Sequence, residues 1–319
     1  MLNKRAIRLF IILIEERVLL FGAGGFIGSA LSIELAKSTT YLGLTRKDLN
    51  VCEYSKVKQI ILEFKPTVVI NATGKVAGIQ GNIDDPVSLM RSNSENILSL
   101  TNVCHELKIN KVIQFASACV YPLNEIDSSK PMDLGTGIIE KSSKPYATSK
   151  IFGIELFNSY RKQFGYKWST VIPTNLYGTG DWKTDNNGHV IAMLTKKFLE
   201  AKKRNLSQVN VWGDGKAIRN FLNIVDLAAL INFFIKNDMF DREIINVSGD
   251  KEVSIEELAT IIKKVSEYQG VIKFDKSKPN GAHRKNLDDE PLRSLGWAPK
   301  VSLEEGIRKY FNELLTLTL

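Results

Sequence analysis

The chain has 319 residues, of which 44% are hydrophobic, enough to bury a substantial core in one large α/β unit or in two domains. Its three cysteines, Cys52, Cys104 and Cys119, form an odd and widely spaced set, which argues against a disulfide framework or a zinc site; we predict free thiols, a cytoplasmic protein and no metal. The net charge of +8 is spread along the chain apart from a cluster between Lys196 and Arg204, and without a nucleic-acid-binding motif it favours anionic small molecules over nucleic acid.

The first sixteen residues precede the predicted fold. Basic residues are followed by an apolar run from Leu9 to Ile14, as in a signal peptide, but Glu15 and Glu16 interrupt it. The run is too short for export or for a membrane span. We interpret residues 1–16 as an N-terminal extension and predict no membrane association.

From Arg17 onward, short apolar runs alternate with longer helical patterns. Strands are predicted at RVLLF, TYLGL, TVVIN, KVIQFA and WSTVI, and helices over 26–37, 52–64, 86–107 and 145–164. Continuous apolar strands separated by helices indicate a parallel sheet covered on both faces. We therefore predict an α/β fold with a Rossmann-like, doubly wound parallel sheet.

After Pro173 the pattern loosens, and a smaller C-terminal α/β region begins. Its predicted elements are a helix over 189–203, strands VNVW, IINV and VIKF, a helix over 225–236, a helix opened by a capping box of Ser254 and Glu257, and a terminal helix from about Ser302. We expect a Rossmann domain from 17–172 plus about 216–247, and a second domain from about 173–215 plus 248–319.

A glycine-rich loop, GAGGFIG, directly follows the first predicted strand. Gly22, Gly25 and Gly28 give Gly-x-x-Gly-x-x-Gly, and Gly24 adds a fourth glycine. Glycines allow a tight turn and let backbone N–H groups at a helix N-terminus contact a pyrophosphate. A merely structural turn is the alternative, but the strand before the loop and the helix after it favour dinucleotide binding.

The residues at the end of the second predicted strand indicate whether the protein binds NAD or NADP. NAD-preferring sites usually carry an acidic residue there, whereas this chain reads YLGLTRKD and places Arg46 at that position. A guanidinium suits the 2′-phosphate of NADP, and a solvated surface arginine is the alternative. We predict NADP(H) as the cofactor.

Tyr146 and Lys150 stand four residues apart in PYATSK, and Ser117 closes the fourth predicted strand. Residues i and i+4 share a helix face, so the ammonium can lie beside the phenol while Ser117 binds the same substrate oxygen. Lowering the phenol pKa from about 10 toward neutrality calls for a cofactor charge and partial burial as well as Lys150. The spacing alone is weak evidence, because Tyr54 and Lys58 repeat it on what we predict to be a solvated helix. The strand-end serine and the glycine loop favour proton transfer at a carbonyl for Tyr146.

These motifs together resemble the extended branch of the short-chain dehydrogenase/reductase family, whose members mostly modify nucleotide sugars. Closer similarity, from about Arg17 to the C-terminus, is to the GDP-L-fucose synthase family within it, in the blocks GKVAGIQGN, SACVYP, PYATSKIFGIELFNSYRKQFG, IPTNLYG, GHVIAML, VWGDG followed by RNFL, and KPNGAHRK followed by LGW. The resemblance implies NADPH-dependent conversion of GDP-4-keto-6-deoxy-D-mannose to GDP-L-fucose by C3/C5 epimerisation and C4 reduction. It also implies a homodimer, with NADP in the first domain and the nucleotide sugar in the second.

The resemblance assigns Cys119 and His189 to the epimerisation. A 4-keto sugar has acidic C–H bonds at C3 and C5, and a thiol and an imidazole have ordinary pKa values of about 8.5 and about 6.5, close enough to neutrality to serve as base and acid. Without the resemblance, a small buried cysteine and a helix-start histidine are the plainer interpretations.

The remaining roles are implied by the resemblance residue by residue. The catalytic set is Ser117, Cys119, Tyr146, Lys150 and His189. The cofactor-binding set is Gly22, Gly24, Gly25, Phe26, Ile27, Gly28, Arg46, Asn71, Ala72, Phe115, Ala116, Lys150, Pro173, Asn175, Leu176 and His189. The substrate-binding set, with two cations for a diphosphate and an indole for stacking or packing, is Ser117, Asn175, Lys197, Trp212, Arg219 and Asn280. The plainer alternatives are a solvated Lys197, a core Trp212 and a surface ion pair at Arg219.

Several positions depart from the family pattern and bear on the substrate. They are Gly24, Ala118, Gly188, Ala192, Asn220 and Asn280. A C4-reductase of a related GDP-deoxyhexose or GDP-deoxyheptose is therefore an alternative. An NAD-dependent nucleotide-sugar 4-epimerase or dehydratase is disfavoured by Arg46 and the Cys119/His189 pair, and a non-enzymatic NADP sensor would have no use for Ser117, Tyr146 and Lys150.

Overall fold

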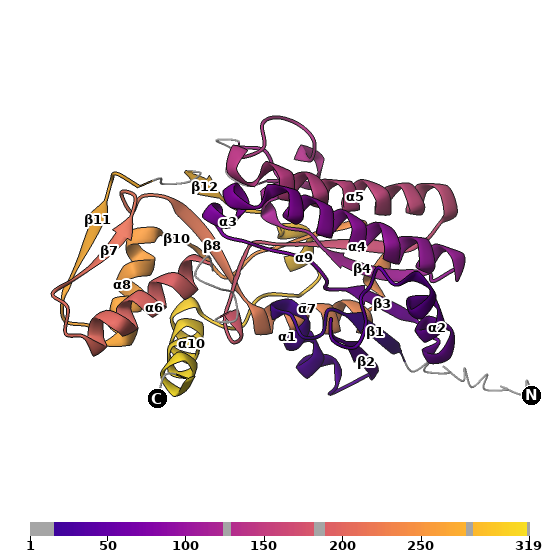
Figure 1. Ribbon diagram of the computed structural model, residues 1–319, viewed down its shortest axis with the longest axis horizontal. Coiled ribbons are helices and arrows are strands. Elements are labelled where there is room, and N and C mark those ends of the chain that lie inside the picture. The colour runs from indigo at the N-terminus through magenta and orange to yellow at the C-terminus, as the bar shows by residue number, and fades with distance from the viewer. Residues whose placement is uncertain (1–15, 124–128, 182–188, 279–282, 318–319) are drawn as a thin grey trace, which may run out of the picture.

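The computed structural model describes residues 16–123, 129–181, 189–278 and 283–317. Its larger region is built around a six-stranded parallel sheet (Figure 1). The strand order is β2-β1-β3-β4-β5-β9. The bounds are β1 (Arg17–Phe21), β2 (Thr40–Leu44), β3 (Val68–Asn71), β4 (Lys111–Phe115), β5 (Lys167–Pro173) and β9 (Ile244–Val247). The predicted doubly wound parallel sheet is confirmed.

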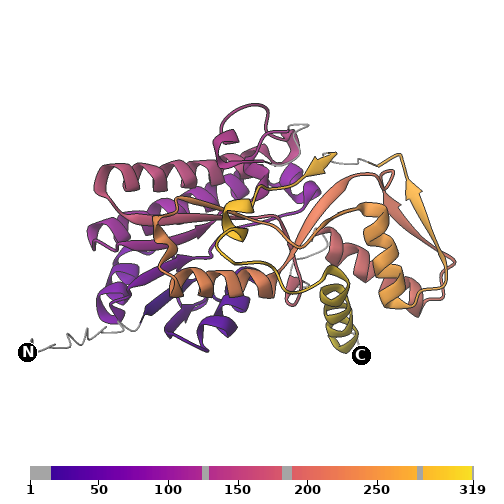
Figure 2. The same ribbon diagram turned by 180° about the vertical axis from the view of Figure 1, so that it is seen from behind.

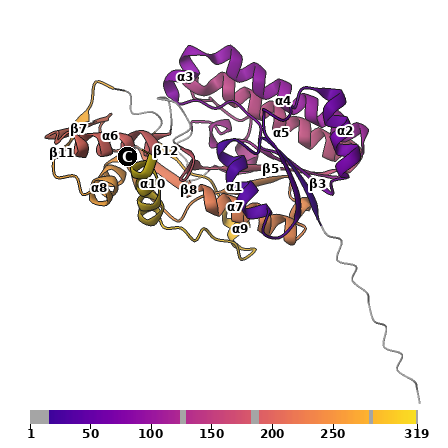
Figure 3. The same cartoon turned by 60° about the horizontal axis from the view of Figure 1, so that its bottom comes forward.

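Helices cover both faces of this sheet, because successive strand side chains point to opposite sides. Val18 and Leu20 of β1 pack in one core with α1 (Phe26–Leu35) and α7 (Ile224–Lys236). Leu19 and Phe21 pack in the other with α2 (Tyr54–Phe64), α4 (Pro86–Glu106) and α5 (Lys144–Phe164). Figure 3 shows the two helical layers on either side of the sheet. The predicted helices are present with small shifts at their ends.

The order of the strands reverses between β1 and β3. The chain leaves β1 toward β2 on one side, whereas β3, β4, β5 and β9 lie on the other. Backbone N–H groups of Gly22 and Ala23 donate to Leu44 O at the end of β2, at 2.9 and 3.0 Å, and draw the glycine loop to that side. Segments that diverge at the carboxyl ends of neighbouring strands leave a crevice, where doubly wound folds bind ligands.

A smaller region lies beside the large sheet, as Figures 1 and 2 show from opposite sides. In it, β8 (Ile218–Asn223) pairs with β6 (Asn175–Tyr177), β10 (Glu252–Ser254) and β12 (Arg284–Lys285), and β7 (Gln208–Trp212) pairs with β11 (Val271–Asp275). Helices α6 (Val190–Lys203), α8 (Ile255–Ser266) and α10 (Leu303–Leu317) share one core with these strands. The predicted capping box is present: Ser254 Oγ accepts from the N–H of Glu257, whose carboxylate accepts from the N–H of Ser254.

The chain passes between the two regions more than once. After β8, α7 packs on α1 and β9 adds the edge strand of the large sheet. Later, α9 (Glu290–Arg293) contacts β9, and Leu292 and Trp297 enter the α1/α7 core. The remaining short helices are α3 (Ile79–Asp84), η1 (Ala118–Val120), η2 (Pro131–Asp133), η3 (Lys141–Ser143) and η5 (Met239–Asp241). No helix in the described part of the chain is both long enough and apolar enough to cross a membrane.

Some predictions fall outside the described residues. These include the extension over 1–15, Gly188 and the candidate substrate ligand Asn280. The short elements α3, β6, β10, β12 and α9 were not predicted, because elements of so few residues leave no periodic pattern. Strand β8 was also missed, because IRNFLN mixes polar and apolar residues and is not a continuous apolar run.

Candidate active site

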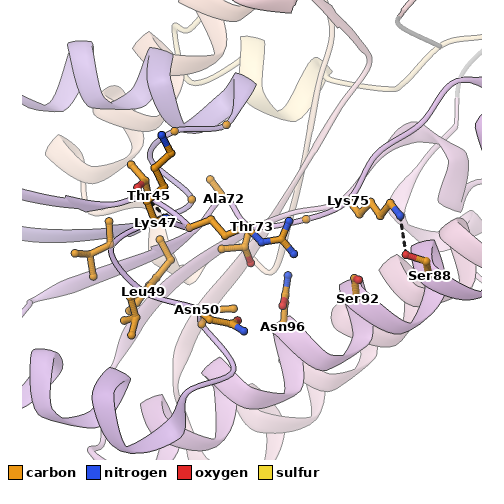
Figure 4. A pocket seen from close by; sticks show the side chains of 18 residues that line it. Thr45, Lys47, Leu49, Asn50, Ala72, Thr73, Lys75, Ser88, Ser92 and Asn96 are labelled. Carbon is orange, nitrogen blue, oxygen red and sulfur yellow. Dashed lines mark hydrogen bonds between the residues drawn. The ribbon is translucent and has the colours of Figure 1, made fainter. Parts of the chain in front are cut away.

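A cavity of about 690 Å³ opens at the point where the strand order reverses (Figure 4). The glycine loop lines it with Gly22, Gly24 and Gly25, and Ala72 lines it from the end of β3. Several further lining residues, on the segments after β2 and β3 and on α4, were not predicted, because their position depends on how α4 passes the crevice. They are Thr45, Lys47, Asn50, Thr73, Lys75, Ser88, Ser92 and Asn96.

The glycine loop fits a dinucleotide pyrophosphate. Gly22 has φ +85°, and a Cβ there would lie 2.6 Å from Ala72 O. A Cβ on Gly28 would lie 1.9 Å from Gly22 O, so the loop packs closely onto α1. Among the described residues, no side chain caps the N-terminus of α1 at Gly25, and the first turn of α1 holds no acidic residue. The backbone N–H groups and positive helix end therefore face the cavity without a competing carboxylate.

The far end of the cavity carries two cations. Arg46 and Lys47 both line it and are solvent-exposed. The nearby Asp48 carboxylate instead accepts hydrogen bonds from the backbone N–H and hydroxyl of Thr45, which lower its pKa. This arrangement suits a phosphate on the adenosine ribose.

The other predicted cofactor residues lie along the carboxyl edge of the sheet. Phe115 ends β4, Ala116 follows it and both are buried, and Pro173 ends β5. Phe26 and Ile27 form the first turn of α1. Three of the predicted residues are turned toward the protein: the Asn71 side chain accepts from Thr73, Asn175 Nδ2 donates to Asn220 O, and Leu176 packs in the core.

Ser117, Cys119 and Tyr146 come together at the end of β4. Ser117 has extended backbone after the strand, and its Oγ accepts from the N–H of Cys119 at 3.4 Å. Tyr146 lies in the first turn of α5, 6% exposed, where the Ser117 hydroxyl hydrogen-bonds its phenol and Cys119 lies close enough to interact electrostatically. The strand end and the helix start thus place a hydroxyl, a thiol and a phenol around one point.

The pKa of Tyr146 differs from the sequence-based expectation. Burial raises it above the ordinary value, with a smaller contribution from Cys119, and the hydrogen bond from Ser117 opposes the shift only in part. Lys150 Nζ lies 5.8 Å from the centroid of the phenol ring and donates to Phe115 O at 3.2 Å, and burial lowers its pKa to about 8. Desolvation of the phenol thus exceeds any effect of the Lys150 ammonium, and partial burial raises the pKa of Tyr146 where it was expected to help lower it. The lowering expected from a cofactor charge stays a prediction. Tyr146 is accordingly protonated at neutral pH and suited to donate a proton.

The second Tyr-x-x-x-Lys pair lies on the surface, as predicted. Tyr54, 41% exposed, and Lys58 both bind the carboxylate of Glu106 across α2 and α4. The same spacing here joins two helices at the surface.

Arg219, a predicted substrate ligand, lies close enough to Cys119 to interact with it electrostatically. Its guanidinium donates to Ile218 O at 2.7 Å and interacts electrostatically with Glu140 and Cys119, while burial lowers its pKa. Glu140, just before η3, forms an ion pair with Lys285 of β12. The Glu140–Lys285 pair was not predicted, since the two residues are far apart in the chain and belong to no motif.

Lys197 and Trp212 are brought together in the smaller region. Lys197 Nζ lies 5.6 Å from the Trp212 ring, and Lys278 Nζ lies at the same distance from it. The indole is 51% exposed, so it is not a core residue. An exposed indole between cations can stack on a base and attract phosphate. Lys278 was missed, because it reaches Trp212 only through the β7–β11 pairing.

His189 is the N-cap residue of α6, and its ring lies beside Phe26 of α1. Its ring is 6.1 Å from that of Phe26, and its Nδ1 is 2.8 Å from Asp181 Oδ1. Burial opposes the charged imidazole, but the hydrogen bond and charge of Asp181 raise the pKa of His189 above its ordinary value. Asp181 was also missed by the sequence analysis.

Comparison with known proteins gives relatives over nearly the whole chain. The GDP-L-colitose synthase of Yersinia pseudotuberculosis is 35% identical over 92% of this chain and 96% of its own, and the GDP-L-fucose synthase of Sinorhizobium fredii is 34% identical over 94% and 96%. A GDP-L-fucose synthetase from Naegleria fowleri, solved bound to NADP, is 25% identical with a TM-score of 0.83, covering 95% of each chain. A GDP-6-OMe-4-keto-L-xylo-heptose reductase from C. jejuni shares the fold, with a TM-score of 0.86 at 23% identity over 95% of this chain and 98% of its own.

The profile of the NAD dependent epimerase/dehydratase family matches residues 18–248, which hold the glycine loop, Ser117, Tyr146 and Lys150. The chain therefore belongs to the NAD dependent epimerase/dehydratase family, in the extended branch of the short-chain dehydrogenases/reductases.

Proposed function

We propose that this protein is an NADPH-dependent nucleotide-sugar epimerase/reductase that converts GDP-4-keto-6-deoxy-D-mannose to GDP-L-fucose by C3/C5 epimerisation and C4 reduction. The observation that carries the proposal is the meeting of Ser117, Cys119 and a protonated Tyr146 at the edge of the sheet where the cofactor cavity opens. The similarity to GDP-L-fucose and GDP-L-colitose synthases supports a GDP-linked sugar as substrate.

Epimerisation uses the acidity that the C4 carbonyl gives to the C–H bonds at C3 and C5. The Cys119 thiolate removes one of these protons, and the resulting enolate oxygen is held by the hydroxyls of Ser117 and Tyr146. The imidazolium of His189 then returns a proton to the opposite face. The thiol and the neutral imidazole regain their starting states by proton exchange with solvent, and the same steps invert the second carbon.

Reduction follows at the same oxygen. When bound, NADPH supplies the hydride that reduces C4. Tyr146 donates its phenolic proton to the oxygen as negative charge develops there, and Ser117 keeps that oxygen in place. Lys150, next to the phenol ring, stabilises the phenolate until it is reprotonated.

The nucleotide is proposed to lie over the smaller region. Trp212 offers an exposed aromatic face for guanine, and Lys197 and Lys278 provide positive charge for the diphosphate. Arg219 interacts electrostatically with Cys119 and with Glu140, which supports a role in contacting the sugar.

The direct test is incubation of the purified protein with NADPH and a panel of GDP-4-keto sugars, following nicotinamide oxidation and identifying products by NMR. We expect oxidation with GDP-4-keto-6-deoxy-D-mannose and a product inverted at C3 and C5. Failure of every sugar to oxidise NADPH would contradict the proposal. Protein that carries tightly bound NAD and turns over without added reductant would instead indicate a 4-epimerase.

The cofactor preference is tested by Arg46→Ala. Removal of a charge-assisted contact to the 2′-phosphate should raise KM for NADPH by about 10- to 100-fold and leave KM for NADH nearly unchanged. Arg204→Ala, which removes an exposed arginine paired with Glu200 on α6, is the control and should change neither constant. A wild-type protein with equal or lower KM for NADH would defeat the assignment of NADP.

A further inference from the structure

A buried carboxylate lies directly against the imidazole of His189. Asp181 is 0% exposed, and its Oδ1 lies 2.8 Å from Nδ1 of His189, whose side chain is 33% exposed. A carboxylate only accepts hydrogen bonds, so Nδ1 carries a proton and donates it to this bond. Nε2 is then the ring nitrogen left to exchange protons with a substrate.

Backbone hydrogen bonds hold both Asp181 and His189 in position. The N–H of Asp181 donates to Gly178 O at 3.1 Å, in the turn that follows β6. His189 has extended backbone at the N-cap of α6, and its carbonyl accepts from the N–H of Met193 at 3.0 Å, the first hydrogen bond of that helix. The Asp181–His189 hydrogen bond therefore joins a turn to the start of a helix. The backbone of both residues is held by hydrogen bonds.

The surroundings of Asp181 are acidic. Helix α10 contributes Glu313, whose Oε1 accepts from the N–H of Gly180 at 3.3 Å, and Tyr310, which interacts electrostatically with Asp181 and Glu313. Burial raises the pKa of Tyr310, so its phenol is neutral. From α1, the neighbour of His189 is the uncharged ring of Phe26. These groups favour a positive charge on the imidazole.

We propose that Asp181 is a positioning residue that holds His189 as an Nδ1-protonated imidazolium and presents Nε2–H as the proton donor for epimerisation. The proposal rests on the proposed function, in which His189 returns a proton to C3 and C5. In each transfer, Nε2–H breaks and a C–H bond forms, leaving a neutral imidazole that is still held by Asp181.

Asp181→Asn keeps the shape of the side chain but removes its charge. The amide can donate to Nδ1 and so favour the tautomer that carries its proton on Nε2, and the loss of charge lowers the pKa of His189. A smaller fraction of His189 is then imidazolium at neutral pH. We expect deuterium incorporation from solvent at C3 and C5 to slow by about 10- to 100-fold, with the fall in rate at high pH moving to lower pH than in the wild type.

Asp226→Asn is the matched control for loss of a buried carboxylate. Asp226 lies on α7 and accepts hydrogen bonds from the backbone N–H groups of Lys300 and Val301, both at 3.0 Å, so its replacement disturbs packing without touching His189. The chain has three histidines, so the ring signals can be assigned by NMR with His189→Gln as reference. The His189 titration should move to lower pH in Asp181→Asn and stay at its wild-type position in Asp226→Asn.

The two measurements separate the inference from the proposed function. The NMR titration needs no substrate, and an unchanged His189 titration in Asp181→Asn would overturn the positioning role by itself. So would deuterium exchange at the wild-type rate in that variant, measured on an enzyme whose wild type is active. Failure of the proposed function has a different signature, because the wild type itself would then neither exchange deuterium nor oxidise NADPH.

Discussion

Tyr146→Phe is expected to lower kcat for NADPH oxidation by about 10²- to 10⁴-fold, because the phenol is the proton donor to the C4 oxygen and phenylalanine has no proton to give. The buried ring is retained, so the fold should change little. Deuterium exchange at C3 and C5, measured by NMR in deuterium oxide, should persist, since Cys119 and His189 remain and Ser117 still holds the oxygen. Stopped-flow absorbance of NADPH measures the reduction step.

The chain supplies its own control for this substitution. Tyr54→Phe removes a phenol at the same spacing from a lysine, but at the surface and bound to Glu106. It should leave kcat unchanged. Equal loss in both variants, or wild-type oxidation by Tyr146→Phe, would remove Tyr146 from the chemistry.

Cys119→Ser should slow proton exchange at C3 and C5 but spare hydride transfer, the reverse of the effect expected for Tyr146→Phe. An alcohol is a far weaker acid than a thiol, so serine is not ionised near neutrality and cannot act as the base. Exchange of the C3 and C5 protons should fall by about 10²- to 10⁴-fold, while hydride transfer to the unepimerised 4-keto sugar continues. The product, identified by NMR, should keep the C3 and C5 configuration of its precursor.

Cys52→Ser controls for loss of a thiol. Cys52 is exposed, its Sγ donates to Asn96 Oδ1 at 3.3 Å, and serine keeps that donor. Exchange and reduction should both match the wild type. Exchange at the wild-type rate in Cys119→Ser would show that another group is the base.

The regular part of the fold follows from local patterns that the sequence displays. RVLLF is apolar at every position after its first, and KVIQFA is apolar at all but Lys111 and Gln114, as expected of strands buried on both faces. The Ser254–Glu257 capping box marks a helix start within one turn. Elements as short as β6 or β12 exist because β8 lies beside them. Their stability comes from tertiary pairing, which no local pattern records.

Residues of the candidate site also differ in whether a local sequence pattern predicts them. Ser117, Tyr146 and Lys150 were found because a strand end and an i, i+4 spacing fix their relation. Asp181 and His189 meet through a turn of irregular backbone, and Trp212 and Lys278 meet through the β7–β11 pairing.

The direction of the Tyr146 pKa shift could not be obtained from spacing either. It is set by how much water the fold removes from the phenol, which depends on packing from several segments.

The repeated passage of the chain between its two regions determines how sugar specificity could be transferred from a relative. Strands and helices over 175–223, 252–285 and 303–317 build the smaller region, whereas α7, β9 and α9, interleaved with them, belong with the large sheet. A chimera made at a single crossover would combine part of one proposed sugar site with part of another. A working exchange must replace the three stretches together and keep the intervening segments. The residues of the smaller region form one structural unit, but they come from three separate stretches of the sequence.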